Sequence, residues 1–140
     1  MSQENVELGY QTMDAFNRRD LDAFLALMDH DVETVPRTTA LEGENYRGHD
    51  GVRRWWNQLL AVFPDFRIEV VDEVRDLGDL TFSLVRLRGS GAGSAAPTNQ
   101  AFWVANRWRR GKCIWWRTFD TRAEALKAVG LSEQDAYADS

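Results

Sequence analysis

The spacing of apolar residues changes near Pro64, and this change constrains the fold more than any other feature of the sequence. Before it, apolar side chains recur every three or four positions, as they do in helices that bury one face. After it, they mostly alternate with polar side chains, as they do in half-buried strands. A chain with helices at one end and strands at the other is typical of the α+β class, in which helices cover one face of a sheet. Its 140 residues are enough for one such domain with its own core.

Polar capping residues predict where three helices begin. Ser2 is suited to cap a first helix over residues 3–18. Asp20 would cap a short second helix, and Asp50 a third one that ends before Pro64. We therefore expect three helices in the first half of the chain.

The expected strands begin with residues 32–35, which follow a turn at Asp29-His30-Asp31 and precede a polar loop over residues 37–48. The remaining strands are expected in the second half of the chain, where they would form an antiparallel meander. They cover residues 66–70, 80–88, 99–109 and 112–119.

Small residues and caps predict the connections in the second half. Residues 89–98 are rich in glycine, alanine and serine and predict a long hairpin loop. A tight turn is expected near Arg110-Gly111. Thr121 and Glu124 form a capping box for a last short helix, which we expect to end at Gly130.

Composition and charge narrow the functional classes. A net charge of −5 disfavours a general nucleic-acid binder, and no apolar run approaches the roughly 18 residues of a membrane span. The N-terminus has no basic region followed by an apolar stretch, so we expect no signal peptide. Cys113 is the single cysteine, which excludes an internal disulfide and agrees with a cytoplasmic protein. Two widely spaced histidines and one cysteine give no metal-ligand pattern, and we expect neither a metal nor a cofactor.

Four segments of the chain resemble the SnoaL-like branch of the nuclear transport factor 2-like superfamily, which includes the ketosteroid isomerases. They are AFNRRDLDAFLALMDHDVE, YRGHDGVRRWW, FPDFRIEV and TRAEALKAVGL. The resemblance spans about residues 2–132. It implies a cone-shaped α+β fold, in which a curved antiparallel or mixed sheet wraps around three N-terminal helices and a short C-terminal helix follows. We expect one domain over residues 1–131 and a loose tail over residues 132–140.

The superfamily contains isomerases, cyclases, hydrolases, dehydratases and non-catalytic binding modules, so fold membership does not fix a reaction. In ketosteroid isomerases a tyrosine and two acids carry the chemistry. A gapless comparison places Thr12 at the tyrosine position and Pro36, or Val35 after a one-residue slip, at the position of the base. The late acid falls at Trp103, or at Val104 after a slip. All three functional side chains are missing, which argues against isomerase chemistry.

Other acid-dependent relatives match only in part. Arg86 and Arg88 supply the arginine of an epoxide hydrolase set, but neither has an acid two residues away on its strand, and we interpret both as solvent-facing. SnoaL-type cyclases need one acid in a dry pocket. Glu33 and Asp120 are the only acids whose strand positions could reach such a pocket, and Asp120 is the better acid–base candidate.

The six tryptophans suggest a pocket with aromatic walls. A two-residue turn at Arg110-Gly111 sets Trp108 opposite Cys113 and Asn106 opposite Trp115. On this register Trp103 and Trp116 share one face of the hairpin, and the resemblance implies that this face lines the inside of the cone. A shifted register would exchange the faces. The expected pocket lining is Thr12, Phe16, Val35, Trp55, Trp56, Trp103, Trp116 and Thr118.

The same alternation leaves an apolar patch on the outer face of the sheet. It consists of Phe102, Trp108, Trp115 and Phe119. Such a patch usually marks an interface, so we expect a homodimer that packs sheet to sheet. The alternative is that the chain covers the patch with its own loop over residues 89–98.

Two functional hypotheses follow. The first is a small-molecule-binding SnoaL-like protein with an apolar aromatic pocket; any reaction there would be a cofactor-independent isomerisation, cyclisation or hydrolysis of a polycyclic or aromatic substrate. The second is a non-catalytic dimeric module whose pocket is filled by tryptophan. The presence or absence of a cavity beside Trp103 and Trp116 would discriminate between them.

Overall fold

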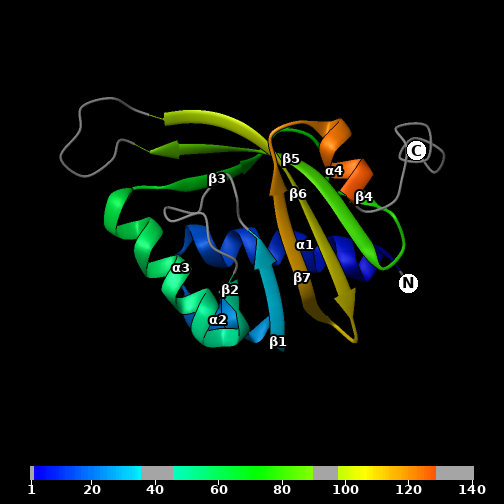
Figure 1. Cartoon of the computed structure of the whole chain (residues 1–140), viewed down its shortest axis with the longest axis horizontal. Coiled ribbons are helices and arrows are strands. Elements are labelled where there is room, and N and C mark those ends of the chain that lie inside the picture. The colour runs from blue at the N-terminus through cyan, green and yellow to red at the C-terminus, as the bar shows by residue number, and fades with distance from the viewer. Residues whose placement is uncertain (1, 36–45, 90–97, 129–140) are drawn as a thin grey trace.

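The computed structural model describes residues 2–35, 46–89 and 98–128, and has the α+β architecture that the sequence predicts (Figure 1). The first half holds α1 (Ser2–Asn17), α2 (Leu21–Ala26), β1 (Met28–Val35), β2 (Tyr46–Arg47) and α3 (Gly48–Val62). The second half holds β3 (Arg67–Val70), β4 (Arg75–Asp76), β5 (Leu80–Gly89), β6 (Thr98–Arg109), β7 (Lys112–Phe119) and α4 (Arg122–Ala128). The expected helix end at Gly130, the tail over 132–140 and most of the two predicted loops lie outside the described residues.

The strands form one curved, unclosed mixed sheet in the order β2-β1-β7-β6-β5-β3, with β4 beside β5. Only the β1–β7 pair is parallel; the other described pairs are antiparallel. Helices α1, α2 and α3 lie along one side of this sheet, and α4 lies beside β6 and β7 (Figure 1). The sheet therefore provides the wall of the cone, and the three N-terminal helices fill its mouth.

Three local predictions in the first half are wrong. The predicted loop over residues 37–48 ends too late, because Tyr46 and Arg47 form β2, which pairs with β1. Asp29-His30-Asp31 is not a turn but part of β1, because pairing of Met28 with Cys113 on β7 extends the strand toward α2. Asp50 does not cap α3; the capping position is Arg47, which makes no side-chain cap hydrogen bond, and Asp50 pairs with Arg53 in the first turn. By contrast, Asp20 caps α2 as predicted, since its side chain accepts a hydrogen bond from the Ala23 N–H.

A bulge in the β6–β7 hairpin overturns part of the predicted face assignment. The turn is at Arg110 and Gly111, as expected, and both have positive φ, which suits a two-residue hairpin. Trp108 opposes Cys113, but Arg107 opposes Trp115, so Ile114 is an extra residue on β7. As a result Asn106 opposes Trp116 rather than Trp115.

This extra residue exchanges the two faces of β6 relative to the prediction, so that each residue of this strand lies on the side opposite to the one expected. Phe102 and Trp108 are buried in the main core with Trp116, whereas Trp103 lies on the outer side in a second cluster with Phe82. Two of the four residues of the predicted dimer patch are therefore core residues.

The outer cluster is covered by the chain itself. Ala125 and Leu126 of α4 pack on Phe82 and Phe119, and all four are buried. Because Phe119 lies in this cluster, Trp115 is the only member of the predicted patch that stays partly exposed. The helix α4 thus covers Phe119 on this face, and the homodimer stays a prediction.

Polar side chains of α1 attach the helix to the open edge of the sheet. The Asn17 amide donates to the Ile68 carbonyl and accepts from the Ile68 N–H, both at 2.8 Å. Because β3 is the last strand of the sheet, this amide takes the place of a missing strand partner. The hydroxyl of Tyr10 likewise accepts from the N–H of Val74 at 3.0 Å.

We predict that Asn17→Ala lowers the free energy of unfolding by about 1–3 kcal/mol, since it removes both bonds and leaves the half-buried Ile68 backbone groups unpaired on that side. Urea denaturation measures the change. Asn57→Ala on the exposed side of α3 is the matched control and should change stability by less than about 0.5 kcal/mol. Equal losses of stability in both variants would show that the two hydrogen bonds between Asn17 and Ile68 contribute nothing.

Candidate functional site

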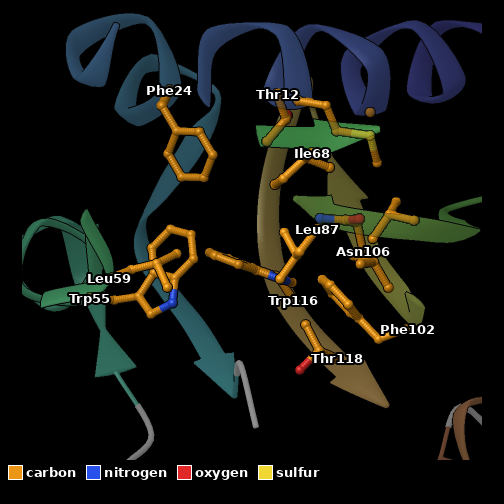
Figure 2. A pocket seen from close by; sticks show the side chains of 14 residues that line it. Thr12, Phe24, Trp55, Leu59, Ile68, Leu87, Phe102, Asn106, Trp116 and Thr118 are labelled. Carbon is orange, nitrogen blue, oxygen red and sulfur yellow. The ribbon is translucent and has the colours of Figure 1, made fainter. Parts of the chain in front are cut away.

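A small cavity lies between the three N-terminal helices and the inner face of the sheet (Figure 2). Its volume is about 40 Å³. On the scale where one buried water needs roughly 10–15 Å³, this is room for a few waters and well below the roughly 300–1,000 Å³ of drug-sized pockets. The lining residues are Gly9, Thr12, Met13, Phe24, Trp55, Leu59, Ile68, Val85, Leu87, Phe102, Val104, Asn106, Trp116 and Thr118.

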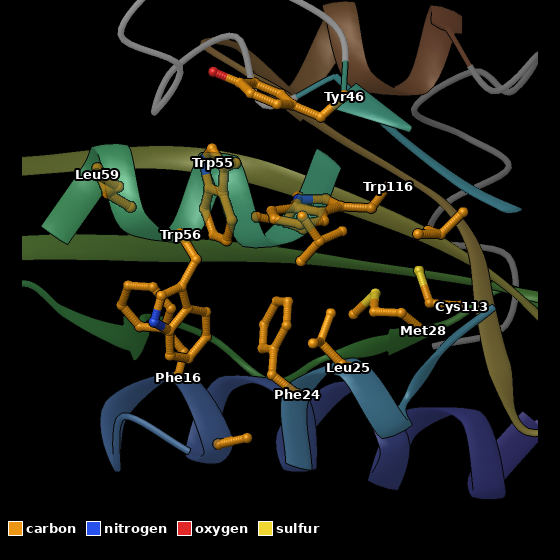
Figure 3. Packing of buried hydrophobic residues seen from close by; sticks show 14 of the residues in the cluster. Phe16, Phe24, Leu25, Met28, Tyr46, Trp55, Trp56, Leu59, Cys113 and Trp116 are labelled. Atoms are coloured by element: carbon orange, nitrogen blue, oxygen red, sulfur yellow. The ribbon is translucent and has the colours of Figure 1, made fainter. Parts of the chain in front are cut away.

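Aromatic packing explains why the cavity is small. Trp55 from α3 and Trp116 from β7 meet edge to face with their ring centroids 4.6 Å apart. Phe24 of α2 completes the wall, with its ring 6.0 Å from that of Trp116 (Figure 3). These three rings occupy the side of the cone where β1 and α3 meet, and the remaining space lies toward β5 and β6.

Apart from the indole N–H groups of Trp55 and Trp116, three side chains give the cavity its polar groups. The Thr12 hydroxyl donates to the Leu8 carbonyl at 2.8 Å, which leaves its oxygen free to accept only. The amide of Asn106 is buried and its Nδ2 points at the Cys113 sulfur over a long distance of 3.6 Å. Thr118 is the third and is also buried. Among the described lining residues, none is an acid, a base or a histidine.

The predicted pocket residues whose side chains the structure describes separate into three groups. Thr12, Trp55, Trp116 and Thr118 line the cavity. Phe16 and Trp56 lie behind it in the aromatic core, where their ring centroids are 5.1 Å apart (Figure 3). Trp103 is on the outer face, stacked on Phe82 at 4.9 Å, because the bulge reverses the faces of β6. Val35 ends β1, and its side chain lies outside the described part of the structure.

Neither candidate acid lines the cavity. Asp120 is exposed just after β7, and Glu33 points to the outer face, where it pairs with Arg47 at 3.1 Å. The arginines of the epoxide hydrolase comparison are also elsewhere, as Arg88 is exposed and pairs with Glu69.

Asn106 is a site residue that the sequence did not predict. An amide between Val104 and Trp108, its apolar neighbours on the same face of the strand, is a signal for a buried polar site, but the predicted hairpin register turned it outward. The same error placed Phe102 and Val104, which share a face with Asn106, on the outside of the sheet.

A family model described as SnoaL-like domain matches residues 10–117. The chain belongs to the SnoaL-like domain family. A search of curated proteins found no match.

Solved structures show the same fold. An NTF2-like protein of unknown function from Burkholderia pseudomallei is 21% identical, with a TM-score of 0.75, and the match covers 91% of this chain and 98% of that one. A ketosteroid isomerase-like protein from Catenulispora acidiphila, in complex with trimethylamine, is 16% identical with a TM-score of 0.73 and coverages of 89% and 93%. TerC, co-crystallised with polyporic acid, is 22% identical with a TM-score of 0.71 and coverages of 87% and 95%.

Two further properties of this SnoaL-like protein concern metals and membranes. Within residues 2–35, 46–89 and 98–128, no three histidine, cysteine or acidic side chains are grouped so that they could hold a metal ion. No helix in the same ranges has both the length and the apolar character to cross a membrane.

Cys113 lies behind Asn106 and is fully buried. Burial raises the pKa of its thiol to about 11. The hydrogen bonds that the sulfur accepts from Asn106 and donates to the Trp115 carbonyl act in the opposite direction and lower the pKa by less. The thiolate is the reactive form, so this side chain is a packing residue rather than a nucleophile.

We predict that the free energy of unfolding falls by about 2 kcal/mol between pH 8 and pH 10 through Cys113 alone, because the unfolded thiol, with an ordinary pKa near 8.5, ionises there and the folded one does not. This contribution of Cys113 to the free energy of unfolding is present below pH 8 and is lost as the pH rises toward 11. Urea denaturation at both pH values measures it, with Cys113→Ala as the reference that lacks the effect. The same pH dependence in both proteins would contradict the assignment.

Proposed function

We propose that this SnoaL-like protein binds a small, mostly apolar organic molecule in the cavity between its helices and sheet, with one hydrogen-bonding group of that molecule facing Asn106. The observation that carries this proposal is a cavity with aromatic and aliphatic walls and a single buried amide in them. Such a combination of apolar walls and few polar groups is typical of small-molecule sites.

The size of the cavity limits the ligand. A polycyclic substrate, which the sequence analysis allowed, exceeds about 40 Å³ by far. A single ring can be accommodated if lining side chains move, and the flexible thioether side chain of Met13 is the one able to give way at small cost. Complexes of two relatives, one with trimethylamine and one with polyporic acid, support the view that this fold accepts small organic molecules.

The lining supports binding rather than acid–base turnover. General acid–base catalysis requires a titratable group within hydrogen-bond reach of the reacting atom. Besides the indole N–H groups of Trp55 and Trp116, the described lining offers only Thr12, Asn106 and Thr118 as polar groups. An amide and hydroxyls can orient a carbonyl or hydroxyl group of a ligand, but they do not exchange protons near neutral pH.

Phenol and toluene test the proposal as a matched pair, followed by the indole N–H signals of Trp55 and Trp116 in nuclear magnetic resonance spectra. We expect phenol to bind more tightly than toluene by about 3–10-fold, because only phenol offers a group to Asn106. Asn106→Leu should remove this preference, and Asp120→Asn should leave both affinities unchanged.

Val104→Leu tests the location of the ligand. Its extra methylene projects into the cavity, so we expect phenol binding to weaken by about tenfold or more while the fold is retained. Val62→Leu, on the exposed side of α3, is the matched control and should bind normally. Unchanged binding by the Val104 variant would rule out this cavity as the site.

The second candidate is the non-catalytic module, and the small volume of the cavity favours it. On this hypothesis Val104→Leu stabilises the protein by improving its packing, and neither phenol nor toluene shifts the Trp55 or Trp116 signals. Sedimentation velocity would report the dimer that the hypothesis also includes.

A further inference from the structure

A second hollow, of about 410 Å³, opens on the outer face of the sheet, away from the apolar cavity. It is lined by Arg107, Ile114, Trp115, Arg117 and Ala128. The bulge creates it, because the extra residue Ile114 lies beside Trp115 on the same side of β7. Two guanidinium groups therefore flank one tryptophan in a protein whose net charge is negative.

Arg117 is held in place but poorly paired. Its guanidinium lies 4.9 Å from the centre of the Trp115 ring, which fixes its plane by a cation–π contact. Its only ion pair with a described residue is to Glu33, at 3.8 Å, and its buried Nε has no hydrogen-bond partner in the described part of the chain. A half-buried guanidinium with five donors normally satisfies more of them.

The local charge favours an added anion. Glu33 is bound more closely by Arg47, at 3.1 Å, than by Arg117. Arg107 donates to the Asp79 carboxylate at 2.9 Å through one guanidinium nitrogen. The guanidinium of Arg107 therefore keeps further donors. Of the arginines that share these two carboxylates, Arg107 and Arg117 line the hollow, and their side chains are 38% and 37% exposed.

We propose that this hollow binds a small organic anion in which a carboxylate is attached to a flat apolar body. The carboxylate lies between Arg107 and Arg117, which flank Trp115 from adjacent strands, and planar guanidinium groups pair well with planar carboxylates. The apolar body lies against Ile114 and the exposed part of Trp115. This site is separate from the inner cavity and does not depend on the function proposed for it.

Benzoate, benzamide and acetate test the proposal on the full chain. The indole N–H signal of Trp115, assigned with Trp115→Phe, reports the outer hollow, whereas those of Trp55 and Trp116 report the inner cavity. We expect benzoate to shift the Trp115 signal and to bind at least tenfold more tightly than benzamide, which lacks the charge, and than acetate, which lacks the ring. Equal binding of the three probes, or shifts only at Trp55 and Trp116, would overturn the proposal.

Variants with opposite expected effects sharpen the test. Arg117→Gln should weaken benzoate binding about tenfold, and Glu33→Gln should strengthen it several-fold, because it removes the competing carboxylate. Arg88→Gln, which removes an exposed arginine of β5, is the matched control and should leave the affinity unchanged. If Arg117→Gln fails to fold, Arg107→Gln replaces it with the same expected loss. A benzoate affinity that is unchanged in the Arg117 and Glu33 variants, or a Trp115 shift that follows protein concentration instead of benzoate, would exclude the site.

Discussion

The contact between Trp55 and Trp116 is the constraint on which the rest of the structure depends. These rings join α3 to β7, two elements that lie far apart in sequence, across the middle of the cone. Phe24 packs against both, so α2 is fixed by the same contact. Large buried aromatic groups contribute most of the apolar area in such a core, and their edge-to-face geometry sets how closely helix and sheet approach. The helices cannot move away from the sheet without breaking this cluster.

The same cluster determines what the cavity can hold. In a cone-shaped sheet the space between helices and strands is available for a ligand, and here aromatic rings use most of it. What remains is apolar, with Asn106 as its buried amide. Packing and function therefore compete for the same volume, which is why the size of a ligand, more than its charge, is limiting at this site.

The hairpin of β6 and β7 links the inner and outer faces. One extra residue, Ile114, turns Asn106 inward and Arg107 outward, and it brings Ile114 and Trp115 together beside Arg117. Since α4 covers the neighbouring apolar residues Phe82 and Phe119, the outer face retains a charged hollow where a broad apolar patch was predicted. A single local irregularity thus shapes both candidate binding sites.

The sequence by itself determined the order of the main helices and strands, the Asp20 cap and the tight turn at Arg110, because these depend on local spacing and chemistry. It also predicted Thr12, Trp55, Trp116 and Thr118 as residues near the inner space, where the structure places them. Only the tertiary structure decided the faces of β6, since alternation with a period of two reverses after one inserted residue and nothing local marks Ile114 as that residue. The volume of the cavity and the cover provided by α4 were likewise decided by packing between elements distant in the chain, which no local pattern encodes.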